Sequence, residues 1–236
     1  MLDFGANTSS AMPTTHTQSP IVTGASVLGV VYADGVMIMA DTLGSYGSMA
    51  RFRDLKRIRK INDSTLVGAS GEYSDFQEIL EFVKQLTVSD WALDDGNILS
   101  SSEIFSFLTR KLYNHRSKVN PLWNQLLIAG FDEGKGLLGY IDLYGTSYKD
   151  NVAATGFGCH LGIPILRKGW RPNLTEAEAR SLLEDAHRVL LYRDCRGLNK
   201  FQVAVSTAKG VEISEPFSLK TEWKFRRFVN PDDIAI

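Results

Sequence analysis

The chain has 236 residues, of which 44% are hydrophobic and 22% charged, a composition that fits one globular domain with a large core. Its formal net charge of −1 gives no global electrostatic case for binding nucleic acid or an anionic membrane surface. No apolar run reaches the length needed to cross a bilayer, and Cys159 and Cys195 form neither a disulfide framework nor a metal-ligand pattern. Reduced thiols are the expectation for a cytoplasmic or nuclear protein.

The first twenty residues, MLDFGANTSSAMPTTHTQSP, are rich in Ser, Thr and Pro. They lack the basic and apolar regions of a secretory signal. This leader is predicted to be extended or disordered.

Two strand hairpins are predicted after the leader. Residues 27–31 and 36–40 are apolar and are joined through Asp34 and Gly35, a pair typical of a tight turn. Residues 57–61 and 65–70 form the second pair. Since these runs are apolar throughout rather than alternating, the strands are expected to be covered on both faces.

Helical periodicity follows, and two helices are predicted from their apolar stripes. The first is predicted to start with a capping box of Ser74 and Gln77, and the second with Ser100 and Glu103. The stripes are Phe76, Ile79, Leu80, Val83 and Leu86 in the first helix, and Ile104, Phe107, Leu108 and Leu112 in the second.

Strands return at residues 125–131, 137–143 and 151–155, and a third helix is predicted from about residue 158. Thr175 and Glu178 predict the capping box of a fourth helix. Its apolar stripe is Ala179, Leu182, Leu183, Ala186, Val189 and Leu190. A last hairpin is predicted over 201–207 and 210–214.

The order is therefore strands, two helices, strands, two helices and strands, with hairpin connections between the strands. Two mainly antiparallel sheets packed face to face, each covered by a helix pair, satisfy this order. The sequence predicts one α/β domain of the α+β type, a four-layer α/β/β/α sandwich.

Three motifs resemble proteasome β-type subunits: GVMIMADTLGSYG at 35–47, ATGFGC at 154–159 and LLYRDCRG at 190–197. TQSPIVTG, LGSYGS and NPLWN further resemble those β-type subunits that lack peptidase activity. The resemblance implies an N-terminal-nucleophile hydrolase fold, no cofactor, and a place in the 28-subunit α7β7β7α7 barrel of the 20S core particle. Its partners would be other proteasome α and β subunits, in the cytoplasm and nucleus.

In active members of that family, removal of a leader after a Gly exposes a Thr whose hydroxyl attacks the substrate carbonyl. A Lys, two carboxylates and two serines support it. The corresponding positions in this chain are Ala25 for the nucleophile, Asp41 and Asp194 for the carboxylates, Arg57 for the Lys, and Phe157 and Gly197 for the serines. The methyl group of Ala25 cannot attack a carbonyl.

The remaining charged groups are expected to be structural. Arg57 stays protonated at physiological pH and cannot exchange a proton. An ion pair between Asp41 and Arg57 is predicted, because buried charges must be paired. Asp194, at a helix C-terminus, is expected to need a partner such as Arg193 or a backbone amide.

Three other hydroxyl side chains lie near the position of the missing nucleophile in the sequence. Ser26 is predicted to face away from the Ala25 direction because adjacent strand side chains alternate. Thr23 would need a cut at its own N-terminal side. Thr17 lies eight residues before Ala25, a span of roughly 26 Å when extended, and would have to fold back.

The resemblance also implies cleavage between His16 and Thr17, carried out by a neighbouring active subunit. Residues 1–16 would then be a propeptide and residues 17–216 the subunit domain. Pro20 and the apolar pair that follows it predict a segment lying along the surface. The histidines His115, His160 and His187 lack the clustering of ligands or catalytic groups.

The C-terminal segment 217–236 combines large aromatic and basic side chains, a pattern suited to an arm in a partner's groove. Its expected binding residues are Trp223, Phe225, Arg226, Arg227 and Phe228. The resemblance implies that this arm reaches the opposite β ring.

The sequence therefore predicts a non-catalytic, structural β subunit of a threonine-type endopeptidase complex. Two alternatives stay open: a competent hydrolase using one of the other hydroxyls, and a free-standing binding domain.

Overall fold

The computed structural model describes residues 19–94, 96, 98–132 and 134–224. In this part of the chain the strands form two sheets, and neighbouring strands pair antiparallel throughout. None of the helices described combines the length and the apolar character that a membrane crossing needs.

The first sheet has eight strands in the order β10-β9-β8-β7-β1-β4-β5, with β6 paired to β7 beside this path. The strands are β1 (Val22–Gly24), β4 (Gly44–Tyr46), β5 (Met49–Phe52), β6 (Ile58–Lys60), β7 (Thr65–Glu72), β8 (Asn124–Asp132), β9 (Lys135–Ile141) and β10 (Ser147–Lys149). The second sheet has the order β11-β2-β3-β12-β13. Its strands are β2 (Val27–Tyr32), β3 (Gly35–Asp41), β11 (Val152–Ala154), β12 (Phe201–Thr207) and β13 (Gly210–Ile213).

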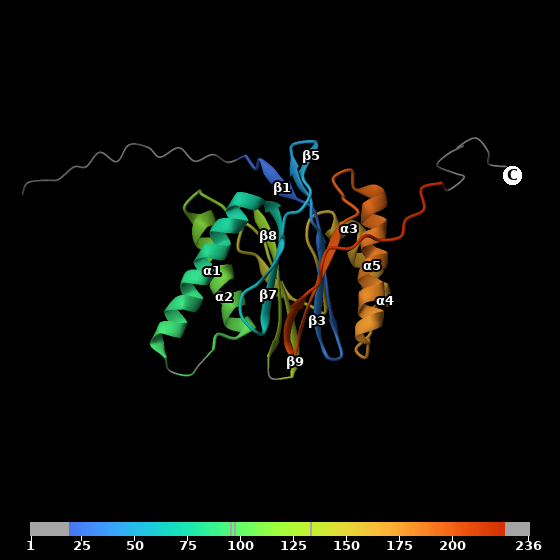
Figure 1. The fold of residues 1–236 in the computed structure, drawn as a ribbon. Coiled ribbons are helices and arrows are strands. Elements are labelled where there is room, and N and C mark those ends of the chain that lie inside the picture. Colours follow the sequence, from blue (N-terminus) through green and yellow to red (C-terminus); the bar gives the residue numbers. More distant parts are fainter. Residues whose placement is uncertain (1–18, 95, 97, 133, 225–236) are drawn as a thin grey trace, which may run out of the picture.

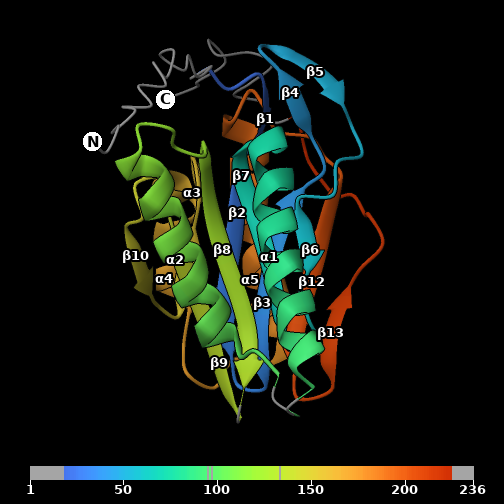
Figure 2. The ribbon, with the colours of Figure 1, turned by 90° about the vertical axis from the view of Figure 1, so that its left-hand side faces the viewer.

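The helices cover the two outer faces. Figure 1 shows α1 (Tyr73–Leu93) and α2 (Ser101–Ser117) on one side of the stacked sheets, and Figure 2 shows them lying over β7 and β8. The helices α3 (Gly158–Leu161), α4 (Ile163–Gly169) and α5 (Glu176–Arg193) lie on the other side (Figure 1). The predicted four-layer sandwich is confirmed.

Strand β3 shows why its sequence is apolar at every position. Val36, Ile38 and Ala40 belong to the core between the sheets, together with residues of β7 and β8. Met37 and Met39 point the other way, into the core under α4 and α5. Since alternate side chains face opposite sides, both faces of the strand are buried as predicted.

The helix starts are partly as predicted. The capping boxes of α2 and α5 are confirmed, with the Ser100 amide donating to Glu103 at 2.8 Å and the Thr175 amide to Glu178 at 3.0 Å. The predicted capping box at the start of α1 is wrong, because the helix begins before Ser74. The N-cap is Glu72, whose carboxylate accepts from the Ser74 amide at 3.4 Å and hydroxyl at 2.8 Å.

Two further features differ from the prediction. The third helix is two short helices that meet at Gly162, and Pro164 in the first turn of α4 has no N–H to donate to a preceding carbonyl. The short strands β1, β4, β5 and β10 were not predicted as strands. β1 ends at Gly24, next to Ala25. Pro20 and Ile21 are exposed, as predicted for a segment along the surface, and the strand begins at Val22.

Candidate functional site

Ala25 and Ser26 lie where the chain crosses from one sheet to the other. β1 ends at Gly24 in the first sheet, and β2 begins at Val27 in the second. The two residues are therefore not on one strand, as the argument about Ser26 assumed. Ser26 is nevertheless buried, and its hydroxyl accepts a hydrogen bond from the Gly158 amide at 2.9 Å.

Arg57 is the centre of this crossing. The residue comes just before β6, is only 2% exposed, and directs its guanidinium under the chain at residues 25 and 26. Its acceptors are Asp41 O at 3.0 Å, Ala25 O at 2.8 Å, Ala69 O at 3.0 Å, Ser26 O at 3.1 Å and the Oδ1 carboxylate oxygen of Asp41. The side chain thus ties β3 and β7 to the crossing segment, and the predicted Asp41–Arg57 ion pair is confirmed.

Gly24 is required by this arrangement. A Cβ atom at residue 24 would lie 2.4 Å from Cδ of Arg57, closer than non-bonded atoms approach. The absence of a side chain at residue 24 therefore leaves room for the Arg57 side chain.

Asp41 ends β3 and uses both carboxylate oxygens. Oδ1 accepts from Arg57, and Oδ2 accepts from the Leu198 amide at 3.1 Å. Burial raises the pKa of the Asp41 carboxyl, while the charge and hydrogen bond of Arg57 oppose that rise. A carboxylate held on both oxygens is fixed in place and orients the guanidinium.

Asp194 and Gly197 form the turn after α5. Asp194 is the C-cap, and its Oδ1 accepts from the Arg196 amide at 2.9 Å. This confirms the expectation that a backbone amide satisfies the carboxylate. The Gly197 amide donates to Asp194 O at 3.2 Å, so this position shapes the turn and offers no hydroxyl.

Phe157 precedes α3 and is 60% exposed. Its ring lines a groove of about 400 Å³ that passes over Ala25. Other residues that line this groove are Thr23, Ser70, Trp123, Asn124, Gln125, Asp194 and Arg196.

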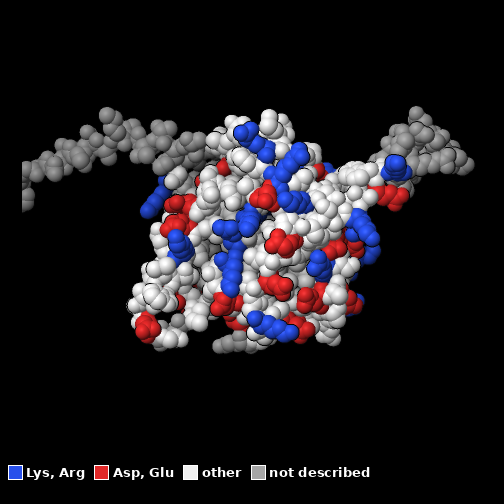
Figure 3. Space-filling model, in the orientation of Figure 1, with Lys and Arg blue, Asp and Glu red and all other residues white. Residues whose placement is uncertain are grey.

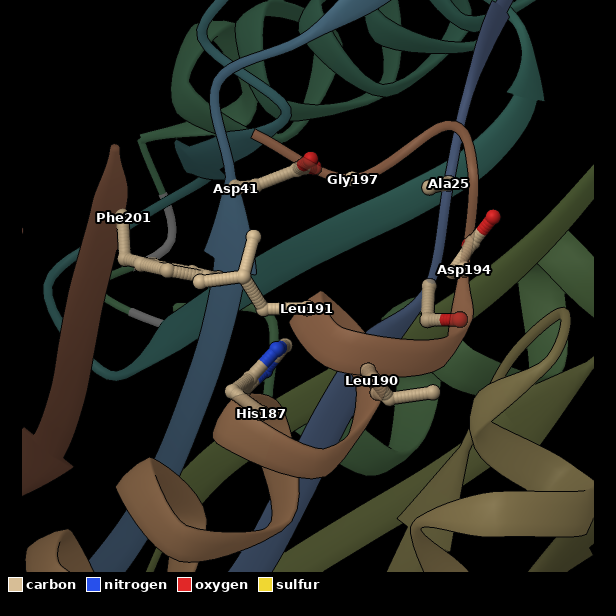
Figure 4. Close-up of a pocket in the computed structure, with 9 residues that line it drawn as sticks. Ala25, Asp41, His187, Leu190, Leu191, Asp194, Gly197 and Phe201 are labelled. Atoms are coloured by element: carbon tan, nitrogen blue, oxygen red, sulfur yellow. The ribbon is translucent and has the colours of Figure 1, made fainter. Parts of the chain in front are cut away.

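Beneath Ala25 lies a separate cavity of about 20 Å³, enough for a single water at most. Figure 4 shows that Ala25 comes to it from the crossing segment, Asp41 from the end of β3, and His187 and Asp194 from α5 and its C-cap. Of the six positions that correspond to catalytic residues of active family members, all except Arg57 and Phe157 line this one cavity. The structure therefore brings together residues that the sequence separates widely.

His187 is a buried histidine of the core. It is 2% exposed, and its Nε2 lies 2.9 Å from the carbonyl oxygen of Met39. Since a carbonyl only accepts, Nε2 carries the proton. Burial lowers the pKa of His187 to about 3, so the ring is neutral at physiological pH.

Glu72 is a site residue that the sequence analysis missed. It is buried, and besides capping α1 its carboxylate accepts from the amides of Ile21 and Val22, the latter at 3.0 Å. Together with the pairing of β1 between β7 and β4, these bonds fix the chain that leads to Ala25. The available signal was the position of an acidic residue between a strand and a helix.

Thr23 also lies within β1, where it pairs with Ser45 and Glu72. His16 and Thr17 lie outside the described residues.

The C-terminal segment leaves the body beside α5. Leu219 is buried, and the Arg188 side chain donates to Lys220 O at 3.1 Å. Trp223 is more than half exposed and packs its ring edge-on to Tyr192, with the centroids 4.9 Å apart. Phe225, Arg226, Arg227 and Phe228 lie outside the described residues.

Metal-binding groups are not gathered in the part of the chain that the structure describes: no three His, Cys, Asp or Glu side chains there could hold one ion. Cys159 and Cys195 are both free thiols. Burial raises the pKa of the Cys159 thiol, which donates to Ala154 O at 2.9 Å.

The fold and the site define a class, the N-terminal-nucleophile hydrolase sandwich with an alanine at the nucleophile position. Residues 21–206 match the family model "Proteasome subunit", and the chain belongs to that family. The resemblance drawn from the motifs is thereby confirmed.

The chain is similar to β type-4 subunits in particular. It is 48% identical to "Proteasome subunit beta type-4" of Arabidopsis thaliana over 216 residues, which cover 92% of this chain and 88% of that protein. It is 45% identical to the Xenopus laevis protein of the same name over 222 residues, 93% of this chain and 92% of that one. "Proteasome subunit beta type-7" of Saccharomyces cerevisiae is 42% identical over 205 residues, 83% of this chain and 77% of that protein.

Proposed function

We propose that this chain is a non-catalytic, structural β subunit of the 20S proteasome core particle. It closes the β ring beside active neighbours and helps to join two half-barrels in ubiquitin-dependent and ubiquitin-independent protein degradation. Its partners are other proteasome α and β subunits.

The observation that carries this proposal is the use of Arg57. The N-terminal-threonine mechanism needs a hydroxyl nucleophile, a free α-amine that can serve as its base, and a cation beside them. Residue 25 has no hydroxyl, its amide is part of a chain continuous with β1, and the Arg57 guanidinium is fully engaged by backbone carbonyls and Asp41. The groove over Ala25 therefore has no hydroxyl at the position where the family carries its nucleophile.

The boundaries of the proposal follow the sequence: a propeptide of residues 1–16, a subunit domain of residues 17–216, and an extension of residues 217–236 that contacts the opposite β ring. Because Leu219 is buried and Lys220 O accepts from Arg188, the free arm begins after these residues. The exposed ring of Trp223 is the first anchor of the arm.

Two measurements test the proposal. Deletion of residues 224–236 spares the packed contacts of 217–223, so the chain should fold and enter half-barrels. Joining of half-barrels, followed by native electrophoresis, should then be slow or blocked. Joining at the normal rate would refute the role of the arm, and Trp223→Ala in the full chain should give a milder delay.

The competing hydrolase is tested by intact mass after treatment with a threonine-directed electrophile. No adduct on this chain is expected in the assembled particle, because Ser26 is buried and Thr23 is held in β1. A stoichiometric adduct would favour the enzyme. A stable monomer at all concentrations would instead favour the free-standing binding domain.

A further inference from the structure

The β4–β5 hairpin is the most exposed part of the first sheet. All four residues of β5 are exposed, and β5 is the terminal strand of its sheet. Figures 1 and 2 show this hairpin at one end of the molecule, beyond the helices and away from the body of the sandwich. The packing of this chain's own core therefore gives no reason for apolar side chains there.

One face of the hairpin nevertheless carries large anchors. Tyr46 and Met49 are cross-strand partners, so their side chains share a face, and they are 52% and 58% exposed. Arg51, two residues along the same strand, is exposed, and its guanidinium carbon lies 5.6 Å from the centroid of the Phe52 ring. Tyr, Met and Arg are the residue types enriched at the centres of protein interfaces.

A basic column continues from the hairpin toward β6. It consists of Arg51, Arg53, Lys56 and Arg59, all exposed. Figure 3 shows Lys and Arg gathered from the top of the molecule down the middle of this face. Within the described part of the chain, none of these four cations is in an ion pair.

Two carboxylates close to the column in the sequence, Asp54 and Asp63, form ion pairs with lysines outside it. Asp54 pairs with Lys200 at 2.8 Å, and Asp63 pairs with Lys60 at 2.5 Å. The four cations of the column are therefore left as an excess of positive charge on a chain whose net charge is −1. A partner that offers carboxylates would neutralise them.

We propose that Tyr46, Met49 and the basic column form a docking surface for a neighbouring subunit of the same particle, which presents an apolar pocket rimmed by Asp and Glu. This inference rests on the proposed function. A protein partner is favoured over nucleic acid because the chain as a whole carries a net charge of −1 and the cations adjoin the exposed apolar side chain of Met49. The charges steer the encounter and fix its register, while Tyr46 and Met49 supply the buried contact.

Incorporation into particles tests this surface. A tagged full-length chain carrying Arg51→Glu, Arg53→Glu and Lys56→Glu is expressed beside the wild-type chain, and the tagged fraction in 20S-sized particles is measured by native electrophoresis. A loss on the order of tenfold is expected, equivalent to about 1.4 kcal/mol of interface free energy. The matched control reverses three exposed cations elsewhere, Lys84, Lys118 and Lys168, and should incorporate like the wild type.

The outcomes separate the two proposals. If the tagged wild-type chain does not enter particles, the proposed function fails. If it enters and the reversed column enters equally well, the docking surface is refuted. A column variant that loses incorporation must also keep the wild-type melting temperature, since a loss of both would show a folding defect and count against the surface.

Crosslinking identifies the occupant directly. A photoreactive residue replacing Met49 in assembled particles should crosslink to one neighbouring subunit, at a peptide containing Asp or Glu. Crosslinks that disappear with nuclease, or an uncrosslinked chain in complete particles, would overturn the inference.

Discussion

Replacing Arg57 by lysine should destabilise the chain even though the charge is kept. Arg57 donates five hydrogen bonds, and a lysine ammonium has three N–H groups. At least two acceptors would lose their donor, at about 1.5 kcal/mol for each hydrogen bond to a charged group. The expected loss is about 3 kcal/mol of unfolding free energy, and roughly 6–12 °C in melting temperature for a chain of this size.

Urea unfolding of the chain, followed by circular dichroism, measures this loss. Arg57→Met should cost about 3–5 kcal/mol, because it leaves the Asp41 carboxylate buried without its cation. Arg180→Lys is the matched control: the Arg180–Glu184 pair lies on the surface at 3.0 Å and should contribute less than about 0.5 kcal/mol. If Arg57→Lys unfolds at the same urea concentration as the wild type, the guanidinium does not hold the crossing together.

Three further predictions concern the same region. The unfolded chain protonates His187 near pH 6.5 and the folded chain only near pH 3, so its contribution to stability is complete above pH 6.5 and falls as the pH is lowered toward 3. About 2 kcal/mol should be lost at pH 5, and His187→Gln should remove that part of the pH dependence in urea titrations. Glu72→Ala should cost about 1–2 kcal/mol and hasten limited proteolysis before Gly24, since the capped helix and β1 both lose their acceptor; unchanged cleavage rates would contradict this anchor. Ala25→Thr should leave the bond after Gly24 uncut and form no electrophile adduct by intact mass, because the Arg57 guanidinium is already occupied; autolysis would show that the hydroxyl alone had been missing.

The four layers could be predicted from the sequence because apolar residues mark the buried faces of strands and helices. The first six residues of β3 are apolar and only the last, Asp41, is charged. A strand covered on both faces explains this pattern. The capping boxes at Ser100 and Thr175 were also predictable, since a capping box depends on residues three apart. The same pattern at Ser74 and Gln77 failed because Glu72 caps α1 two residues earlier. These features are local, so one sequence suffices.

Features set by distant contacts were not predictable in the same way. β1 has three residues and becomes a strand because β7 and β4 provide partners on both sides. Glu72 looks like an ordinary acidic residue until the fold brings the Ile21 amide to its carboxylate. For the same reason, the motifs identified Arg57 and Asp41 as a pair, but not the four carbonyls around the guanidinium.

Residues 24, 25 and 57 depend on one another through direct contacts. The guanidinium of Arg57 fits only because residue 24 has no Cβ, and it holds the carbonyls of Ala25 and Ser26 in place. Since those bonds fix the crossing between the two sheets, we expect the cation to serve mainly as a structural tie. Returning a hydroxyl to residue 25 would therefore change one atom of the site without freeing the charge that a nucleophile needs beside it. The missing hydroxyl at residue 25 and the hydrogen-bonded guanidinium of Arg57 therefore belong to one structural arrangement.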